Sequence, residues 1–211
     1  MRSKTPLYKI VMLGDSGVGK TCLVCRLTNP NAVLNTDVPA TMGIEFDTQL
    51  INTSVGTVKA QIWDTAGQER FARVLLPTYF RKAKGVLMVF DLTNIATLHS
   101  LQTRWSSQMR DNADDDDLVK VLIGNKCDIA SDTDIQKQAK AFAATNSMEY
   151  IETSALTGTA VSTAFETLLN SVHLKAISDQ RSGVKRGVAE ADVIDLKATQ
   201  GGKGEEAKGC C

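Results

Sequence analysis

A glycine-rich segment that ends in a lysine and a threonine is the first feature of the chain that could do chemistry. Gly14–Thr21 reads G-x-x-x-x-G-K-[ST] and follows an apolar run. In such a segment the backbone N–H groups turn inward as a nest for anions, above the positive end of a helix. Lys20 can reach the β- and γ-phosphates of a nucleotide, and the Thr21 hydroxyl can bind Mg²⁺. The predicted phosphate-binding loop and its continuation are Asp15, Ser16, Gly17, Val18, Gly19, Lys20, Thr21 and Cys22.

A second polar motif indicates which base is bound. Asn125-Lys126-Cys127-Asp128 follows the apolar run Val121–Gly124. The Asp128 carboxylate can accept hydrogen bonds from N1–H and the exocyclic amine of guanine, whereas adenine has no donor at either place. Such a site rejects the wrong base because its acceptor would be left unpaired. Lys126 can lay its stem over the base, and Asn125 can tie this motif to the phosphate-binding loop.

A third motif, Glu152–Leu156, ends a later strand-like segment. The backbone N–H of Ala155 is placed to donate to guanine O6, so Ser154, Ala155 and Leu156 are predicted nucleotide-binding residues. A surface turn is the alternative reading of Asn125–Asp128 taken alone. The phosphate-binding loop upstream and Ser154–Ala155 downstream favour a guanine-nucleotide site instead.

Residues between these motifs could sense the γ-phosphate. Asp64 can hold Mg²⁺ through water, Gly67 can donate its N–H to the γ-phosphate, and Gln68 can orient the attacking water. Thr41 can offer its hydroxyl to Mg²⁺ and its backbone to the γ-phosphate. The predicted metal ligands are therefore Thr21, Thr41 and Asp64, and the predicted catalytic residue is Gln68.

Alternating strand-like and helix-like segments must position these motifs. Short continuous apolar runs, such as Val86–Val89 and Val119–Ile123, are typical of strands covered on both faces. Their alternation with helical patterns predicts an α/β fold with a mainly parallel sheet, and the short link Asn52–Gly56 predicts one antiparallel edge hairpin. The expected strands are Leu7–Leu13, Ile44–Ile51, Thr57–Trp63, Gly85–Asp91, Leu118–Gly124 and Met148–Glu152, and the expected helices are Thr21–Leu27, Ala96–Arg110, Asp132–Thr145 and Val161–Ile177.

The composition argues against several other functions. The 211 residues carry 24 basic and 24 acidic side chains, so overall charge gives no reason to expect nucleic-acid binding. The sequence holds no apolar run long enough to cross a membrane, and its polar start is too short for a signal peptide. Cys22 and Cys25 form a C-x-x-C without partners at zinc spacing, which favours helix packing over a metal site.

Together the motifs resemble those of the Ras superfamily of small GTPases, and most closely those of its Rab family. The resemblance covers about Leu7–Ile177 and all five guanine-nucleotide motifs. It is carried by Gly14–Thr21, Met42–Phe46, Trp63–Phe71, Tyr79–Arg81 and the terminal Cys210-Cys211. It implies the P-loop NTPase fold, with a six-stranded, mostly parallel sheet, one antiparallel edge strand and five flanking helices.

The resemblance also implies a function. In a GTP/GDP cycle with slow hydrolysis, γ-phosphate contacts to Thr41 and Gly67 would hold two switch segments, about 29–43 and 64–80, and hydrolysis would release them. The implied role is in vesicle traffic, for a monomer whose partners are an exchange factor, a GTPase-activating protein, a GDP-dissociation inhibitor and effectors. Effectors are expected at Ile44, Phe46, Trp63 and Tyr79. A GTP-loaded scaffold with little hydrolysis is the alternative.

The sequence departs from the Rab pattern in the first switch segment. Thr21–Thr41 is longer than is usual for the family and contains no Phe or Tyr, where relatives carry an aromatic residue over the guanine edge. Val33 or Leu34 replaces that residue poorly, so we expect faster nucleotide exchange. No arginine is placed by a motif to act on the γ-phosphate in cis, so an activating protein is expected to supply that charge.

The C-terminal part of the chain is predicted to be a separate unit. Residues 1–177 are expected to form the nucleotide-binding domain, and the polar, glycine-rich residues 178–211 a mobile tail. Rab chains that end in Cys-Cys are typically geranylgeranylated, so the resemblance implies lipids on Cys210 and Cys211. Six basic and six acidic residues follow from Asp179 onward, so a second lipid rather than a basic patch would complete the anchor. The expected location is the cytoplasmic face of an intracellular membrane, with a cytosolic pool.

The substitution Asp128→Asn tests the assignment of guanine. An amide in place of the carboxylate removes an acceptor for the N1–H and amine of guanine and adds a donor that suits xanthine. We expect guanine nucleotides to lose affinity relative to xanthine nucleotides by roughly 10²-fold or more in competition binding. An unchanged base preference would contradict the assignment.

Overall fold

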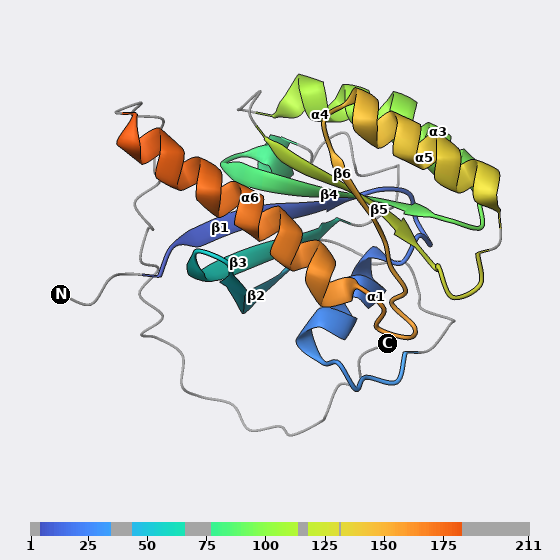
Figure 1. The fold of residues 1–211 in the computed structure, drawn as a ribbon, viewed down its shortest axis with the longest axis horizontal. Helices are drawn as coiled ribbons and strands as arrows, with labels where there is room; N and C mark the ends of the chain where they lie inside the picture. The colour runs from blue at the N-terminus through green and yellow to red at the C-terminus, as the bar shows by residue number, and fades with distance from the viewer. Residues whose placement is uncertain (1–4, 35–43, 66–76, 114–117, 131, 183–211) are drawn as a thin grey trace.

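A six-stranded sheet forms the centre of the computed structural model, which describes residues 5–34, 44–65, 77–113, 118–130 and 132–182. The strand order is β2-β3-β1-β4-β5-β6 (Figure 1). β2 and β3 pair antiparallel, and every other neighbouring pair is parallel, which confirms the predicted fold. The strands are β1 Leu7–Leu13, β2 Ile44–Thr53, β3 Gly56–Thr65, β4 Ala83–Asp91, β5 Val119–Asn125 and β6 Glu149–Glu152.

Helices pack on both faces of this sheet. α1 and α6 cover one face, and α3, η1, α4 and α5 cover the other (Figure 1). Within the described ranges, every helix is too short or too polar to span a bilayer. The helices are α1 Lys20–Thr28, α3 Ile95–Ser100, the π-helical turn η1 Leu101–Trp105, α4 Ser106–Asn112, α5 Thr133–Thr145 and α6 Val161–Arg181.

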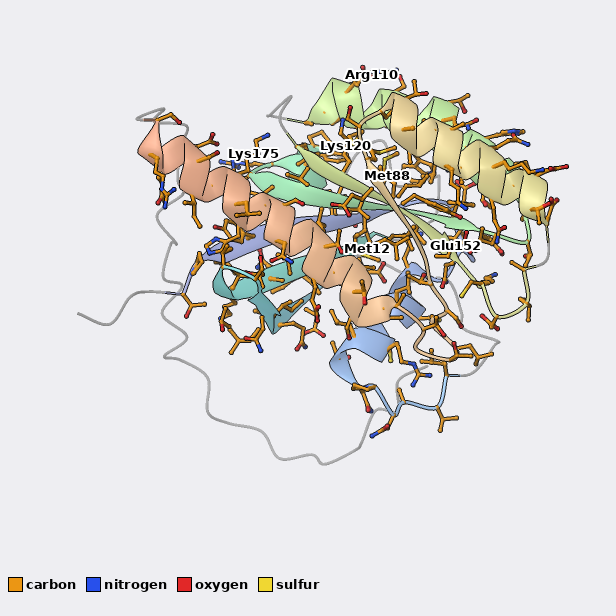
Figure 2. The ribbon with its side chains drawn as sticks, in the orientation of Figure 1. Met12, Met88, Arg110, Lys120, Glu152 and Lys175 are labelled. Carbon is orange, nitrogen blue, oxygen red and sulfur yellow. The ribbon has the colours of Figure 1, made fainter. Side chains whose placement is uncertain are left out.

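The apolar run of β1 serves both layers of the core. Ile10 and Met12 pack in the cluster under α1 and α6, whereas Val11 and Leu13 pack in the cluster under α3 to α5. All four side chains are completely buried because successive residues of a strand point to opposite faces. Met12 and Met88, both labelled in Figure 2, belong one to each cluster.

Two helices differ from the predicted ranges by more than a residue at either end, or in their winding. The single helix expected over Ala96–Arg110 is interrupted by the π-helical turn η1, in which the N–H of Ser106 donates to the carbonyl of Leu101. The last helix does not end at Ile177 but continues to Arg181, where the N–H of Ser182 donates to the carbonyl of Ser178. Ser178–Arg181, which were predicted to belong to the tail, are therefore helical.

The hairpin that leads into the motif around Asp64 is fixed at its tip. Ser54 and Val55 form a two-residue turn between β2 and β3. Asn170 of α6 accepts hydrogen bonds from the N–H of Ser54 at 2.7 Å and from its hydroxyl at 3.1 Å. A second bond joins α6 to the sheet, because the Tyr8 hydroxyl lies 2.8 Å from His173 Nδ1. The hairpin is thereby held against α6.

Candidate nucleotide-binding site

The predicted motifs meet at one edge of the sheet. The phosphate-binding loop follows β1, and Asn125 ends β5. Ser154 is the second residue after β6, and Asp64 is the penultimate residue of β3. Because β1, β3, β5 and β6 run in the same direction, their carboxyl ends lie together, where ligands bind in open α/β sheets.

Glycine is required at two positions of the phosphate-binding loop. A Cβ at Gly14 would lie 2.1 Å from the Val89 carbonyl oxygen, and a Cβ at Gly19 would lie 2.4 Å from Asn125 Nδ2. Gly19 also has φ 95°, in the left-handed region. It caps α1, whose first turn carries no acidic residue. The positive end of this helix therefore faces the loop without a competing carboxylate of its own.

The ammonium of Lys20 is buried behind the loop. Only 5% of the residue is exposed, and Nζ donates to the carbonyls of Gly14 and Asp15, each at 2.8 Å. Burial lowers the pKa of Lys20 to about 8, although the nearby carboxylates of Asp64 and Asp15 oppose this change. A phosphate would give the buried cation a stronger partner than two neutral carbonyls do.

Two of the three predicted metal ligands are in contact. The hydroxyl of Thr21 donates to Oδ2 of Asp64, which is buried beside Lys20. A hydroxyl and a carboxylate are oxygen ligands of the kind that Mg²⁺ takes when phosphates complete its shell. These residues therefore fit a magnesium ion.

A metal cage of another kind is not found in the described part of the chain. No group of three or more His, Cys, Asp and Glu side chains there could hold a metal ion. Cys25 is buried in α1, and Cys22 packs beside the core cluster under α1 and α6.

The side chain of Asn125 joins three segments of the site. Its Nδ2 donates to the Val18 carbonyl at 2.8 Å, which confirms the predicted tie to the phosphate-binding loop. Its Oδ1 accepts from the Thr153 hydroxyl at 3.2 Å and from the Ala155 N–H at 3.1 Å. The Ala155 N–H predicted for guanine O6 thus has a protein acceptor here, which it would have to share with the base.

Asp91 is a site residue that the sequence did not reveal. Its carboxylate forms an ion pair of 2.6 Å with Lys126, which holds a left-handed backbone with φ 68°. Burial alone would raise the pKa of Asp91, but hydrogen bonds from Lys126 and Thr93 outweigh it and lower the pKa. Asp91 ends β4, next to β5, and thereby fixes the motif that also contains the exposed Asp128.

Arg26 is a second such residue. From α1 its guanidinium donates to the carbonyls of Ala155 and Leu156, each at 2.8 Å, and to the carbonyl of Pro30 at 2.5 Å. One cation thus joins the segment predicted to contact guanine O6 with the beginning of the first switch segment. Arginine suits this role because its planar fork offers several donors in fixed directions.

The aromatic residues predicted for effectors come together on the β2–β3 hairpin and the segment before β4. Phe46 stacks on Trp63 with ring centroids 5.5 Å apart, and Tyr79 meets Trp63 edge-on at 6.1 Å. Phe46 is 57% exposed, whereas Tyr79 is 3% exposed. Phe46 therefore presents most of the accessible aromatic surface of this group.

Several predicted site residues lie outside the described parts. They are Thr41, Gly67, Gln68, Cys210 and Cys211. Ile44 is the first residue of β2, and it pairs with Thr65, the last residue of β3.

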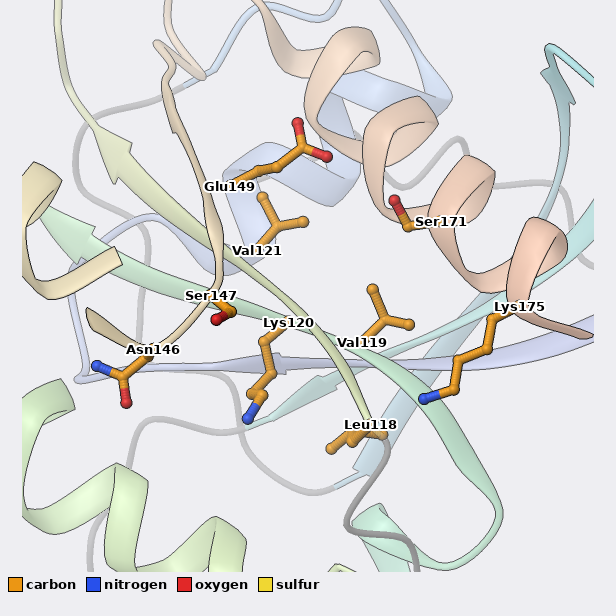
Figure 3. Close-up of a pocket in the computed structure, with 9 residues that line it drawn as sticks. All are labelled: Leu118, Val119, Lys120, Val121, Asn146, Ser147, Glu149, Ser171 and Lys175. Carbon is orange, nitrogen blue, oxygen red and sulfur yellow. The ribbon is translucent and has the colours of Figure 1, made fainter. Parts of the chain in front are cut away.

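A pocket of about 340 Å³ lies at the opposite edge of the sheet and is separate from these motifs. Val119 and Lys120 of β5, together with Lys175 of α6, contribute to its lining (Figure 3). Asn125, at the other end of β5, takes part in the nucleotide motifs. The pocket contains none of the predicted nucleotide-binding residues.

Known proteins have sequences similar to this chain over most of their length. The sequence model of the Ras family matches residues 9–174. Ras-related protein YPTC6 of Chlamydomonas reinhardtii is 38% identical over 97% of this chain and 94% of its own. Ras-related protein RABA2a of Arabidopsis thaliana is 39% identical, and Ras-related protein rab-11.1 of Caenorhabditis elegans 40% identical, with the same two coverages.

Substitution of Arg26 tests the link that it makes. In Arg26→Ala, the Ala155 and Leu156 carbonyls lose a charged donor, so the guanine-contacting segment is held less firmly. We expect GDP to dissociate about tenfold faster, since a hydrogen bond to a charged group contributes about 1.5–3 kcal/mol. Stopped-flow release of a fluorescent GDP analogue measures this rate. Arg26→Lys keeps the charge but not the planar guanidinium, so its GDP release rate should lie between those of the wild type and Arg26→Ala. An unchanged rate in both variants would refute the link.

The pKa of Lys20 predicts a pH dependence of nucleotide binding. Below pH 8 the amine is protonated in both the free and the bound protein. Above pH 8 the free protein loses this proton, whereas a bound phosphate raises the pKa of Lys20 and retains it. Binding then takes up a proton, so affinity should fall as pH rises, by up to about tenfold per pH unit.

Calorimetric titration with GDP, in two buffers of different ionisation enthalpy, measures this proton uptake directly. Lys20→Met is the control, because it should bind weakly without the uptake above pH 8. A wild-type titration with no proton uptake above pH 8 would show that Lys20 stays charged in the free protein.

Proposed function

The chain belongs to the Rab family of the Ras superfamily of small GTPases, and we propose that it acts as a membrane-anchored switch that recruits effectors in vesicle traffic. As a member of this family, it binds GTP and GDP and hydrolyses GTP. The observation that supports the switch most directly is the hydrogen bond between Thr21 and Asp64 beside the buried Lys20. It joins the phosphate-binding loop to the segment that would sense the γ-phosphate.

The phosphate end of the site would work by positioning and charge. Lys20 would turn from the carbonyls of Gly14 and Asp15 toward the β- and γ-phosphates, since an anion is the stronger acceptor. Thr21, Asp64 and Thr41 would hold Mg²⁺, which supplies positive charge to the phosphate oxygens when bound. Gln68 would orient the attacking water.

The guanine end of the site would provide specificity. Asp128, exposed at the surface of its loop, would accept from N1–H and the exocyclic amine of the base. Asn125 holds this loop to Val18, so the base and the phosphates would be gripped by loops in a fixed relation. Arg26 of α1 stabilises the same arrangement by donating hydrogen bonds to the carbonyls of Ala155 and Leu156.

Effectors would recognise the GTP-bound state at the β2–β3 hairpin. Contacts of Thr41 and Gly67 with the γ-phosphate would order the two segments that flank this hairpin, and hydrolysis would release them. Phe46 stacked on Trp63 supports an effector surface here, because exposed aromatic residues often anchor protein interfaces. Effectors, an exchange factor, an activating protein and a GDP-dissociation inhibitor are the proposed partners.

Lipids on Cys210 and Cys211 would place this switch on the cytoplasmic face of an intracellular membrane. Membrane fractionation of cells that express Cys210→Ser/Cys211→Ser tests the anchor. We expect this variant in the soluble fraction and the unaltered chain largely in the membrane fraction, because stable anchoring takes two signals. Ala207→Ser/Lys208→Ser is the matched control and should stay with membranes. Retention of the cysteine variant on membranes would overturn the proposed anchor.

A further inference from the structure

One carboxylate oxygen in the phosphate-binding loop accepts hydrogen bonds from three side chains of a distant helical segment. Oδ1 of Asp15 lies 2.9 Å from the hydroxyl of Ser100, 2.6 Å from Nη2 of Arg104 and 2.8 Å from Nε1 of Trp105. The Asp15 side chain is 20% exposed, and Trp105 is 1% exposed. These bonds are therefore largely shielded from water.

The π-helical turn explains why three donors reach the same atom. In an α-helix, the residue five positions on lies about 140° round the axis from the first. In a π-helical turn the hydrogen bond spans five residues, so positions four and five after Ser100 both return to its side. Arg104 and Trp105 occupy these positions within η1. The Ser106 hydroxyl also donates to the Leu101 carbonyl at 2.6 Å, which supports the wider turn.

Asp15 passes this constraint to Lys20. Its carboxylate faces η1, while its backbone carbonyl accepts from Lys20 Nζ at 2.8 Å. Ser16 and Gly17, which follow it in the loop, are exposed. A fixed Asp15 therefore fixes the first peptide of the loop and, through it, the resting position of the lysine.

Arg104 also cancels a charge that would oppose phosphate binding. An unpaired carboxylate in a loop that receives phosphates would repel them. The guanidinium at 2.6 Å neutralises Asp15, and it lies 4.5 Å from the centre of the Trp105 ring, which keeps its plane in place. The pair is partly buried, so solvent screens it less than it would screen a surface pair.

We propose that η1 anchors the phosphate-binding loop, and that Ser100, Arg104 and Trp105 are positioning residues for guanine-nucleotide binding that act through Asp15. This inference rests on the nucleotide binding of the family and not on the membrane role. A failure of the membrane anchor would leave it untouched.

Release of a fluorescent GDP analogue from the full chain in Mg²⁺ buffer tests the proposal. Arg104→Met leaves the Asp15 charge unpaired, and Trp105→Phe removes one donor while an aromatic side chain stays. Each should speed release about tenfold, since a hydrogen bond to a charged group is lost. Arg110→Met is the matched control: Arg110 lies exposed in α4, on the same helical segment (Figure 2), and its variant should release GDP at the wild-type rate.

A double substitution separates action through Asp15 from a general loss of structure. Asp15→Asn keeps the shape and the Oδ1 acceptor but removes the charge that Arg104 neutralises. In the Asp15→Asn background, Arg104→Met should therefore change the release rate less than about threefold. An effect of Arg104→Met that is equally large in both backgrounds would overturn the proposal, as would wild-type release from both Arg104→Met and Trp105→Phe.

Ser100→Ala keeps the test decisive if the larger substitutions prevent folding. Alanine favours the helix, and only one neutral donor is lost, so release should speed up about two- to fivefold with an unchanged thermal unfolding midpoint. A wild-type rate in this variant would count against the anchor.

Discussion

The amide of Asn125 is the interaction on which the geometry of the site depends. It is the only side chain in the described parts that bonds the phosphate-binding loop and the segment after β6 at once, through Val18, Thr153 and Ala155. An amide suits this position because one end donates while the other accepts, so a single buried group satisfies polar atoms from both loops. With 1% of the residue exposed, a replacement that lost either end would leave buried polar atoms without partners.

Around this amide, three charged residues of the site each lie close to an opposite charge from another element. Lys20 lies beside Asp64 of β3, Lys126 is paired with Asp91 of β4, and Asp15 with Arg104 of η1. Buried charges are costly unless they are paired and hydrogen-bonded. These pairs therefore bind the loops to the sheet and helices. Lys20 hydrogen-bonds the neutral carbonyls of Gly14 and Asp15 although Asp64 lies near, so it has the most to gain from an incoming phosphate.

The fold and the motif residues could be predicted because their signals are local. A continuous apolar run such as Val86–Val89 identifies a strand buried on two faces. The spacing of glycine, lysine and threonine within Gly14–Thr21 identifies a phosphate-binding loop. Asp91 could also have been found, since it ends a predicted strand beside the one that ends in Asn125. A helix was predicted over Ala96–Arg110, within the observed segment Ile95–Asn112. The π-helical turn inside it was not predicted, because the residues of η1 fit an α-helix as well.

The residues that sequence reasoning missed act across long distances in the chain. Arg26 looks like an ordinary basic residue in the last turn of a helix, where it would favour the helix dipole. Its partners at Ala155 and Leu156 are backbone carbonyls, which no side-chain pattern reveals. Arg104 and Trp105 likewise fit a helical pattern and belong to no nucleotide motif, and only the packing of η1 against the loop brings them to Asp15.

The π-helical turn η1 contains one residue more than the α-helical turn that could stand in its place. Because the wider turn absorbs the extra residue, deletion of one residue from η1 would restore regular winding and leave α4 almost in phase. Met109 would then keep its place in the core cluster under α3 to α5. What the deletion would remove is the pair of adjacent positions that return to the side of Ser100, and with it one of the donors to Asp15.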